Sequence, residues 1–492
     1  MDQLIVVESR KAFPLDVPGA QIVTAREYLT SKRFVDMRRA KVFNLCRDHG
    51  YQALGYYVSL LAAARGHRPL PSLGTIQNLR HVAVIRTTSE ELEALIERSL
   101  SRVGSDTYEL SMYFGQNVAA KYDRLCQTLF SLFPAPLLKA TFRRVPKEGW
   151  RLTDLSLLSM SDVPEAHHYF LIDRTRHYFD KPRPKDPEML RYDLAILTNP
   201  EENDAPSNER AIEKFVRAAR QIGIRAFVIG KEDYARVAEY DALFIRETTG
   251  VNHHTFRFAN RAAREGLVVI DDPESILRCC NKVYQAELFD KNGIPAPRTM
   301  VVHGGNRREV EATLGLPCVL KRPDSSFSQG VVKASTPAEL KDYLERFLEN
   351  SELVVAQAYV KSDFDWRVGV LDGRALYVCR YYMARGHWQI QKTTENGKRS
   401  FGRHETMAVE DAPQAVVGLA VRAANLIGHG LYGVDLKEVD GRLLVMEVND
   451  NPSIEAGVED TVLKDELYRR IMRVFYERLE QKGRHQTLGS VR

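Results

Sequence analysis

The sequence predicts an α/β protein with α+β elements, divided among several domains. Short apolar strands alternate with helices from Tyr192 to Ile270, the order that produces βαβ units. More apolar strands follow residue 317, and two of them read as a hairpin that turns at Asp440 and Gly441. A chain of 492 residues has room for two to four domains of ~100–200 residues each.

The composition is that of a globular protein. It is 44% hydrophobic and 27% charged, and its formal charge of +5 does not by itself indicate nucleic acid. No apolar run approaches the ~20 residues that a membrane-spanning helix needs, and the start of the chain lacks the features of a signal peptide. The six cysteines show no CxxC pair and no disulfide-like spacing, so we expect a reducing cytoplasm.

Residues 1–185 form the first predicted domain, of mixed structure. Its expected elements are strands at Leu4–Val7 and Val82–Arg86, a mainly helical stretch from Tyr28 to Ala64, and a helix from Ser89 to Ser101 that Ser89 caps. Its many aromatic residues favour packing, with a substrate-reading surface as the alternative. A proline-rich segment, residues 179–187, then predicts an extended linker.

Residues 190–275 form the second predicted domain, a small α/β unit with a largely parallel sheet. Strand ends in such sheets host ligands, so Arg246, which follows the third strand of the unit, is a candidate substrate residue. His253 and His254 are neighbours at the start of a predicted helix, where adjacent side chains diverge. We therefore expect solvated or packed histidines here rather than a metal site.

Residues 280–482 form the third predicted domain. A helix begins at Lys282, and a strand that ends at Lys321 is joined to the strand Val331–Ala334 by a loop of small residues. Such a loop suits phosphate binding by backbone N–H groups and one lysine charge. Between Arg380 and Arg403, six basic residues accompany one acid. A solvated face, attraction of an anionic substrate and nucleic-acid binding are the alternatives for that segment.

The predicted hairpin at residues 433–452 carries side chains that an apolar hairpin does not need. Glu447 and Asn449 are two residues apart and share one face of their strand, while Asp435 lies on the other strand. Buried carboxylates need partners, and two carboxylates with an amide suit Mg²⁺. The alternative is a hairpin with satisfied or solvated acids.

Asp435 can lie beside Glu447 and Asn449 only if all three side chains point to the same face of the hairpin. With Val439 opposite Arg442 across a plain two-residue turn, Asp435 would lie opposite Met446 and point away from Glu447. The three side chains converge only if the hairpin carries an odd loop or a bulge, which we expect near Asp440 and Gly441.

The order of these parts resembles the ATP-grasp superfamily, and most closely the RimK-type glutamate ligases, in which the aspartate and glutamate are also twelve residues apart. The resemblance covers about residues 190–480 and implies an ATP-grasp fold preceded by a pre-ATP-grasp domain. The first 180 residues resemble the N-terminal domain that is fused to some RimK-like proteins. The implied reaction converts a carboxylate and ATP to an acyl-phosphate, which an amine attacks to give an amide and ADP.

The resemblance also implies roles for individual residues. Lys282 and Lys321 would hold the ATP phosphates beneath a loop with Ser325, Ser328 and Gly330, while Gln357, Ala358, Tyr359 and Val360 would meet the adenine and Asp365 would lie beside the nucleotide. Asp435, Glu447 and Asn449 would bind Mg²⁺, with Mn²⁺ as a second choice, and Arg367 and Arg380 would stabilise the acyl-phosphate and the tetrahedral intermediate. Arg246, His387 and Asn451 are the candidate substrate residues.

The sequence departs from the RimK pattern in the phosphate loop, in the hinge and after Arg380, and the last of these departures lies on the acceptor side. The loop keeps Gly330 but has serine at two glycine positions, Ala358 stands in place of a glutamate, and the Arg-x-Asn turn is not recognisable. We therefore expect a ligase for a small-molecule or peptide carboxylate and an amine, without assuming glutamate addition to a protein tail. We also expect a homo-oligomer without nucleic-acid or membrane partners. The alternative is a non-catalytic ATP-binding module that recruits a partner through its N-terminal half.

Overall fold

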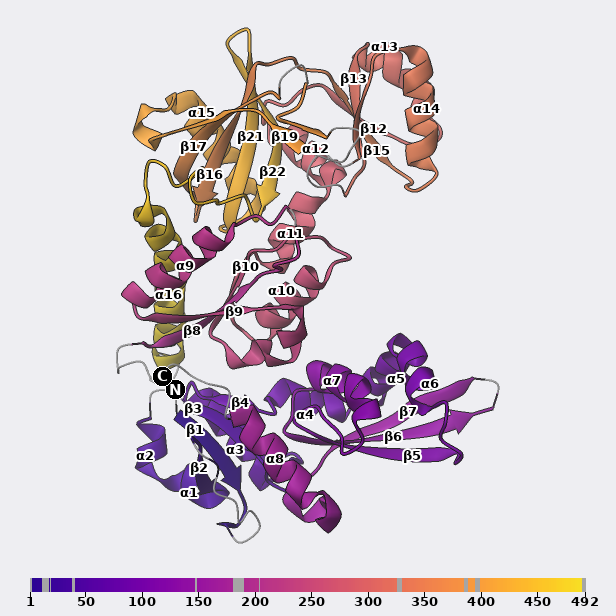
Figure 1. Ribbon diagram of the computed structural model, residues 1–492, viewed down its shortest axis with the longest axis vertical. Helices are drawn as coiled ribbons and strands as arrows, with labels where there is room; N and C mark the ends of the chain where they lie inside the picture. Colours follow the sequence, from indigo (N-terminus) through magenta and orange to yellow (C-terminus); the bar gives the residue numbers. More distant parts are fainter. Residues whose placement is uncertain are drawn as a thin grey trace. The chain divides into compact units, whose positions relative to one another are not determined.

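The computed structural model describes residues 2–10, 17, 19–37, 40–146, 148–179, 190–202, 204–324, 330–384, 388–393 and 399–488. The chain forms two compact units, whose elements are labelled in Figure 1. Unit 1 comprises residues 1–188, 233–239 and 481–492, and unit 2 comprises residues 189–232 and 240–480. Among the helices of the described ranges, none has the length and apolar character needed to cross a membrane.

Unit 1 begins with a parallel four-stranded sheet in the order β2-β1-β3-β4. Its elements are β1 (Asp2–Val7), β2 (Gln21–Thr24), α1 (Ala25–Thr30), α2 (Lys32–Val35), β3 (Ala40–Asn44), α3 (Leu54–Ala64), β4 (Arg68–Leu70) and α4 (Leu73–Leu79). The expectation of a mainly helical stretch from Tyr28 to Ala64 is wrong, because β3 lies within it. β3 is a short, fully buried strand, which lacks the polar alternation that makes a half-buried strand visible in a sequence.

The rest of unit 1 is an antiparallel sheet, β5-β6-β7, with helices. Its elements are α5 (Val82–Glu91), α6 (Glu93–Leu100), β5 (Thr107–Tyr113), α7 (Asp123–Leu132), β6 (Leu137–Val145), β7 (Gly149–Leu157) and α8 (His168–Phe179). The strand expected at Val82–Arg86 is wrong, because this β-branched segment is the start of α5 and packs against β7. Ser89 is not a helix cap either. It is buried within α5, and its Oγ accepts a hydrogen bond from the Leu152 amide at 2.9 Å.

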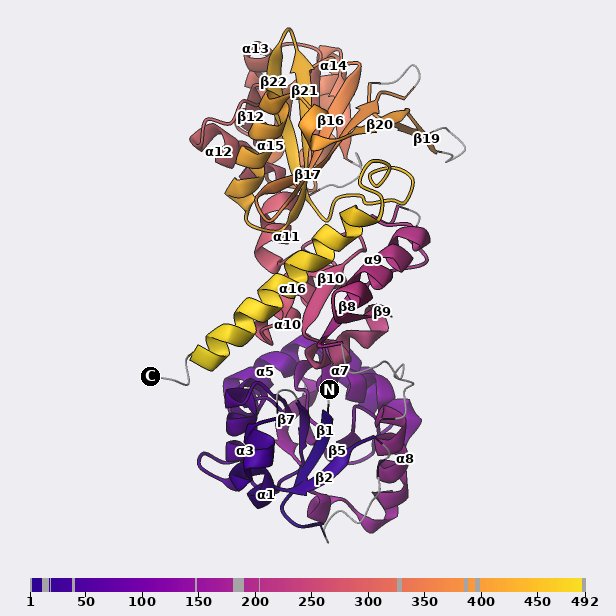
Figure 2. The same ribbon diagram turned by 90° about the vertical axis from the view of Figure 1, so that its left-hand side faces the viewer.

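Unit 2 also begins with a parallel four-stranded sheet, here in the order β11-β10-β8-β9, as the alternation of strands and helices predicts. Its elements are β8 (Tyr192–Leu197), α9 (Glu209–Gln221), β9 (Ile224–Ile229), β10 (Ala242–Ile245), α10 (His254–Arg264), β11 (Val268–Ile270) and α11 (Pro273–Cys280). The helix α16 (Asp465–Leu488) returns from the end of the chain and lies beside α9 (Figure 2). Phe215 of α9 packs edge-on against Tyr468 of α16, with ring centroids 4.8 Å apart.

The two parallel sheets repeat one topology. Read from its other edge, the sheet of unit 2 has the order β9-β8-β10-β11, which matches β2-β1-β3-β4 of unit 1. Helix α3 spans residues 54–64 and helix α10 spans residues 254–264, so the two helices begin 200 positions apart. The strands β4 and β11 begin 200 positions apart as well. A glycine with positive φ follows each helix, Gly66 at 71° and Gly266 at 73°. Residues of α3 and α10 therefore occupy equivalent places in two copies of one α/β unit.

A buried carboxylate secures α16 to α9. Asp460 is 4% exposed, and its carboxylate accepts hydrogen bonds from Lys214 Nζ at 2.6 Å, the Gly457 amide at 2.7 Å and Tyr468 Oη at 3.1 Å. Burial by itself raises the pKa of this carboxyl, but the hydrogen bonds from Lys214 and Gly457 outweigh it and hold the pKa of Asp460 below its ordinary value.

We expect Asp460→Asn to destabilise unit 2 by about 2 kcal/mol at neutral pH, because charge-assisted hydrogen bonds to a buried group are lost. The lowered pKa means that the ionised carboxylate stabilises the fold above its unfolded pKa of ~3.9 and loses this effect as the pH falls through the folded value. Urea unfolding of both proteins at pH 7 and at acid pH should show the difference shrinking below about pH 4. The matched control is Asp465→Asn, which removes an exposed partner of the same lysine, 3.5 Å away, and should change stability by less than about 1 kcal/mol.

Two antiparallel sheets complete unit 2, in the orders β12-β15-β13-β14 and β20-β17-β16-β21-β22, with a separate two-stranded β18-β19 ribbon. The first set of elements is α12 (Lys282–Lys291), β12 (Thr299–Val302), α13 (Val310–Leu314), β13 (Cys318–Lys321), β14 (Val331–Ala334), α14 (Pro337–Leu348) and β15 (Val354–Ala358). The second set is β16 (Phe364–Leu371), β17 (Arg374–Tyr382), β18 (Gln391–Thr393), β19 (Arg399–Phe401), β20 (His404–Met407), α15 (Gln414–Ile427), β21 (Leu431–Val439) and β22 (Arg442–Asp450).

Candidate functional site

A cleft of about 1860 Å³ in unit 2 collects most of the residues that the sequence singles out. It is bordered by the loop after β8, the turn after β10, the strands β13 and β15, and the hairpin β21–β22. Of the candidate residues, Arg246, Lys282, Lys321, Gln357, Ala358, Tyr359, Val360, Asp365, Arg367, Asp435, Glu447, Asn449 and Asn451 line this cleft. Segments far apart in the sequence thus meet at one place.

The hairpin β21–β22 contains the bulge that convergence requires. Val439 pairs with Arg442 across a two-residue turn, and the register then shifts between Asp435 and Leu436. Leu436 pairs with Val445 while Asp435 pairs with Glu447, so Met446 is the extra residue. The expected bulge exists, but it lies at Met446 and not beside the turn, because Asp440 and Gly441 both adopt the positive φ of a tight hairpin turn.

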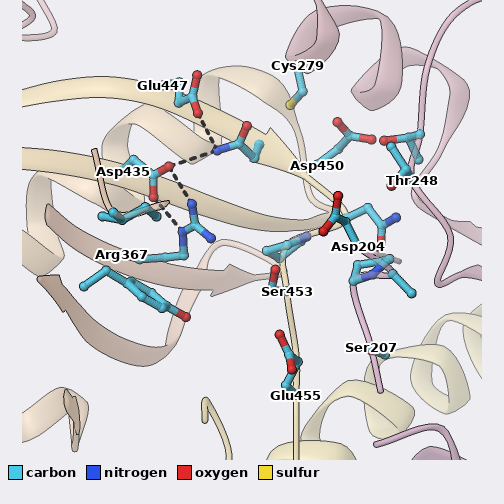
Figure 3. A pocket seen from close by; sticks show the side chains of 18 of the residues that line it. Asp204, Ser207, Thr248, Cys279, Arg367, Asp435, Glu447, Asp450, Ser453 and Glu455 are labelled. Carbon is cyan, nitrogen blue, oxygen red and sulfur yellow. Dashed lines mark hydrogen bonds and ion pairs between the residues drawn. The ribbon is translucent and has the colours of Figure 1, made fainter. Parts of the chain in front are cut away.

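The carboxylates of the hairpin meet one arginine and one amide. Arg367 Nε lies 2.7 Å from Asp435 Oδ1 and its Nη2 lies 2.8 Å from Oδ2, a bidentate ion pair (Figure 3). The amide nitrogen of Asn449 lies 3.2 Å from Asp435 Oδ2 and 3.3 Å from Glu447 Oε1. Burial raises the pKa of Asp435, although Arg367 opposes this shift.

Two lysines bring positive charge to the same carboxylates. Lys282 is the first residue of α12, whose cap Asn281 accepts a hydrogen bond from the Tyr284 amide at 3.0 Å. Lys321 ends β13 and is 8% exposed, and burial lowers its pKa. For Glu447, burial would raise the pKa, but Lys282 and Lys321 together hold it below its ordinary value. An ionised Glu447 therefore faces two ammonium groups.

The donor set fits Mg²⁺. Asp435, Glu447 and Asn449 offer only oxygen ligands, since a half-turn of the Asn449 amide exchanges its nitrogen for its oxygen. The lysines and the arginine beside them suit phosphate oxygens, which Mg²⁺ prefers as additional ligands.

The strand β15 and the segment after it form an apolar and aromatic wall. Gln357 is 6% exposed, and its Nε2 donates to Thr299 Oγ1 at 3.0 Å. Tyr359 lies edge-on to Trp388, with ring centroids 6.1 Å apart, and Lys333 Nζ lies 4.9 Å from the Tyr359 ring centre. Trp388 is not among the residues that the sequence singles out, although it directly follows His387.

The loop after β13 and the segment before Trp388 are described only in part. Ser325, Ser328 and His387 lie outside the described residues. Gly330 has a φ of 75°, and its carbonyl accepts a hydrogen bond from the Arg322 amide at 2.9 Å. A side chain at this position would be strained by that backbone conformation.

Asp365 has a partner that the sequence analysis missed. Lys437 Nζ lies 2.5 Å from Asp365 Oδ1 and 2.7 Å from Ser362 Oγ. Lys437 is two residues after Asp435 and so shares its face of β21. That period-2 relation predicts the face of β21 on which Lys437 lies, but not its pairing with Asp365.

Arg380 does not face the cleft, so the expectation that it lies beside the substrate is wrong. In the register of β16 and β17, Arg380 pairs with Trp366 while Arg367 pairs with Cys379. Paired residues share a face, so the two arginines point to opposite sides of the sheet. The guanidinium of Arg380 lies 4.4 Å from the Trp366 ring centre and 3.7 Å from Glu405 Oε2.

Arg246 and Asn451 are engaged with each other and with the chain around them. Arg246 is fully buried, and its guanidinium donates to Ser207 Oγ, Asn451 Oδ1 and the carbonyls of Pro206 and Pro452 at 2.6–3.0 Å. The Asn451 amide donates to the Glu247 carbonyl at 2.6 Å. These contacts favour a role in shaping the cleft wall over direct contact with a substrate.

Two buried aspartates near this wall also escaped the sequence analysis. Asp450 lines the cleft at the end of β22, and Asp271, which directly follows β11, is fully buried. Burial raises the pKa of Asp450 to about 7, and burial and the charge of Asp450 raise that of Asp271 well above its ordinary value. The sequence around these two aspartates does not predict their burial, because that burial results from contacts between segments far apart in the chain.

Comparisons with known proteins bear on both units. Residues 25–174 match the family model of the RimK-like ATPgrasp N-terminal domain, and residues 279–471 match that of the RimK-like ATP-grasp domain. A probable alpha-L-glutamate ligase 1 of Pseudoalteromonas atlantica is 27% identical over 231 residues, which are 46% of this chain and 73% of that protein. A probable alpha-L-glutamate ligase of Vibrio vulnificus is 24% identical over 250 residues, 50% of this chain and 78% of its own.

Two solved structures are also similar to part of the chain. D-alanine–D-alanine ligase from Bacillus anthracis, complexed with ATP, is 15% identical with a TM-score of 0.47, covering 59% of this chain and 99% of its own. A RimK domain ATP-grasp protein from Sphaerobacter thermophilus is 15% identical with a TM-score of 0.44, covering 57% and 98%.

Proposed function

The chain belongs to the RimK-like ATP-grasp family, and we propose that its cleft is the active site of an ATP- and Mg²⁺-dependent ligase that joins a carboxylate to an amine. The observation that carries the proposal is the meeting of Lys282 and Lys321 with the pair Asp435 and Glu447 in one cleft. The product of the first half-reaction is an acyl-phosphate with release of ADP, and amine attack then gives the amide and phosphate.

Each group of residues has a part in this proposal. Lys282 and Lys321 bind the phosphates, and the segment from Gln357 to Val360 lies against the adenine. Asp435, Glu447 and Asn449 hold Mg²⁺, which neutralises the charge that develops on the phosphates. Arg367, which Asp435 holds in place at 2.7 Å, points its guanidinium at the transferring phosphoryl group and the oxyanion of the tetrahedral intermediate.

The opposite part of the cleft suits the amine. Figure 3 shows Asp204, Asp450 and Glu455 on the side away from Asp435 and Glu447, and Glu202 and Glu459 also line the cleft. The ionised carboxylates among them favour an amine acceptor that arrives as an ammonium ion. A small-molecule or peptide carboxylate then enters between this acidic part and the lysines.

The proposal is tested by product formation with the purified chain. ATP, Mg²⁺ and a panel of carboxylates, glutamate among them, are combined with a panel of amines, and ADP release is measured together with the mass of the product. We expect ADP and amide in equal amounts, only when a carboxylate and an amine are both present. Hydroxylamine used as the amine should trap the acyl-phosphate as a hydroxamate.

A different result would favour a non-catalytic module. If the chain binds ATP with Mg²⁺ and yet releases no ADP with any pair of the panel, the ligase proposal fails. Binding without turnover would then point to recruitment of a partner through residues 1–185.

A further inference from the structure

Glu247, His253 and His254 bring one carboxylate and two imidazoles together beyond the end of β10. One ligand atom of each residue lies within 4.8 Å of the others. His254 Nε2 is 2.8 Å from Glu247 Oε1, and the ring centroids of the two histidines are 4.0 Å apart. In the part of the chain that the structure describes, no other three histidine, cysteine or acidic side chains meet this spacing.

The expectation that these neighbouring histidines diverge is wrong for a local reason. His253 is the cap of α10 and has extended backbone angles, φ −103° and ψ 160°, so its side chain does not follow the 100° step of the helix. The ring of His253 therefore turns toward that of His254 instead of away from it.

The repeated α/β unit serves as an internal control for this cluster. Ala53 caps α3 with the extended angles φ −74° and ψ 167°, as His253 caps α10, and Leu54 begins α3 as His254 begins α10. Glu247 precedes His254 by the same seven positions as Arg47 precedes Leu54. The same topology thus forms with arginine, alanine and leucine at these places, so the fold itself does not require a carboxylate and two imidazoles.

We propose that Glu247, His253 and His254 bind one divalent metal ion of the Zn²⁺ class. Two imidazoles and one carboxylate, with a fourth position open, are a donor set that Zn²⁺ accepts, unlike the oxygen-only set of Asp435, Glu447 and Asn449. Glu247 is only 2% exposed, and a buried carboxylate is stabilised by a cation. His253 Nδ1 lies 3.0 Å from Thr255 Oγ1, an outer partner that leaves Nε2 for the metal.

The metal would order the turn that borders the cleft. Glu247 stands between Arg246 and Thr248, which both line the cleft, and its carbonyl accepts a hydrogen bond from Asn451 at 2.6 Å. Thr255 Oγ1 donates to the Thr248 carbonyl at 3.3 Å. A metal bound by side chains on both ends of this turn fixes its path without contacting the phosphate site.

The test is a titration of the tag-free, chelator-treated full chain with Co²⁺ in excess Mg²⁺, which keeps the oxygen-only site occupied. We expect one equivalent of Co²⁺ with the intense visible absorption of a tetrahedral or five-coordinate nitrogen and oxygen site, and displacement of that signal by one equivalent of Zn²⁺. Co²⁺ that gives only the weak spectrum of the hexaaqua ion, with no defined stoichiometry, would overturn the proposal.

Co²⁺ titration of substituted proteins tests whether the two histidines are the ligands. His253→Ala and His254→Leu place at each position the residue found in the repeated unit, so both should fold, and each should weaken Co²⁺ affinity by about 100-fold or more, since even outer partners contribute 10–100-fold. The matched control is His81→Ala, which removes the exposed cap histidine of α5 and should leave the titration unchanged. Affinity of the wild-type order in His253→Ala, or an equal loss in His81→Ala, would refute the site.

Discussion

Glu447→Gln should leave the fold intact and lower ADP release by about 10³-fold, the loss expected when a charge that stabilises the transition state is removed. Glu447 keeps its shape as a glutamine and still accepts a hydrogen bond from Asn449, but it no longer offers a carboxylate to Mg²⁺ or a counter-charge to Lys282 and Lys321. ADP release at saturating ATP, measured across a range of Mg²⁺ concentrations, is the readout. Circular dichroism and the urea midpoint report on the fold.

The matched control is Glu438→Gln, on the other strand of the same hairpin. Glu438 is exposed and accepts a hydrogen bond from Trp366 Nε1 at 3.3 Å, which a glutamine oxygen also accepts. We expect its turnover to equal that of the wild type. If the Glu447→Gln variant releases ADP at the wild-type rate, Glu447 is not a ligand of Mg²⁺, and the hairpin carboxylates have only a structural role.

Arg367→Ala and Arg380→Ala should differ sharply, although the sequence predicts the same role for both residues. Arg367→Ala leaves Asp435 buried without its bidentate partner, so we expect a loss of about 3 kcal/mol in the free energy of unfolding. Turnover should fall by about 10²–10³-fold when the guanidinium no longer faces the phosphoryl group. Arg380→Ala removes a guanidinium that stacks on Trp366 on the other face of the sheet, with a loss of about 1 kcal/mol and unchanged turnover.

The comparison separates catalysis from stability. Both variants are assayed well below the urea concentration at which they begin to unfold, so that the fraction of folded protein does not enter the rate. A double variant, Arg367→Ala with Asp435→Asn, should recover part of the lost stability, because the uncompensated charge is gone, but no turnover. If Arg380→Ala proves inactive while Arg367→Ala retains its rate, the assignment of the cleft face is reversed and the proposal for Arg367 fails.

The hairpin β21–β22 shows how far local pattern can reach. Spacing and alternation put Asp435, Glu447 and Asn449 on a hairpin and demand a bulge, because the side-chain period of a strand is two and a plain turn would separate the carboxylates. The structure contains such a bulge, but the extra residue is Met446 and not a residue beside the turn. A bulge and an odd loop satisfy the alternation equally, so their position depends on the packing of the strands rather than on their sequence.

Arg380, Asp271 and the histidine pair show where local pattern ends. Which face Arg380 takes depends on the register of β16 against β17, a pairing between strands that the sequence does not contain. The complete burial of Asp271 depends on the packing of β11 and its neighbours around it. The side chain of His253 does not follow the 100° rotation per residue of the helix, because His253 is the N-cap of α10 and not its first helical residue. A sequence does not define the start of a helix to within one residue.

Periodicity, caps and turns within about fifteen residues are enough to predict many elements of unit 2, the lysines at the starts and ends of those elements, and the two carboxylates and the amide of the hairpin. The three-dimensional arrangement is needed to see which side chains share the cleft, that Lys437 pairs with Asp365, that Arg380 faces away from the cleft, and that one α/β topology occurs twice. These properties depend on strand register and burial, which are set by contacts between segments far apart in the chain.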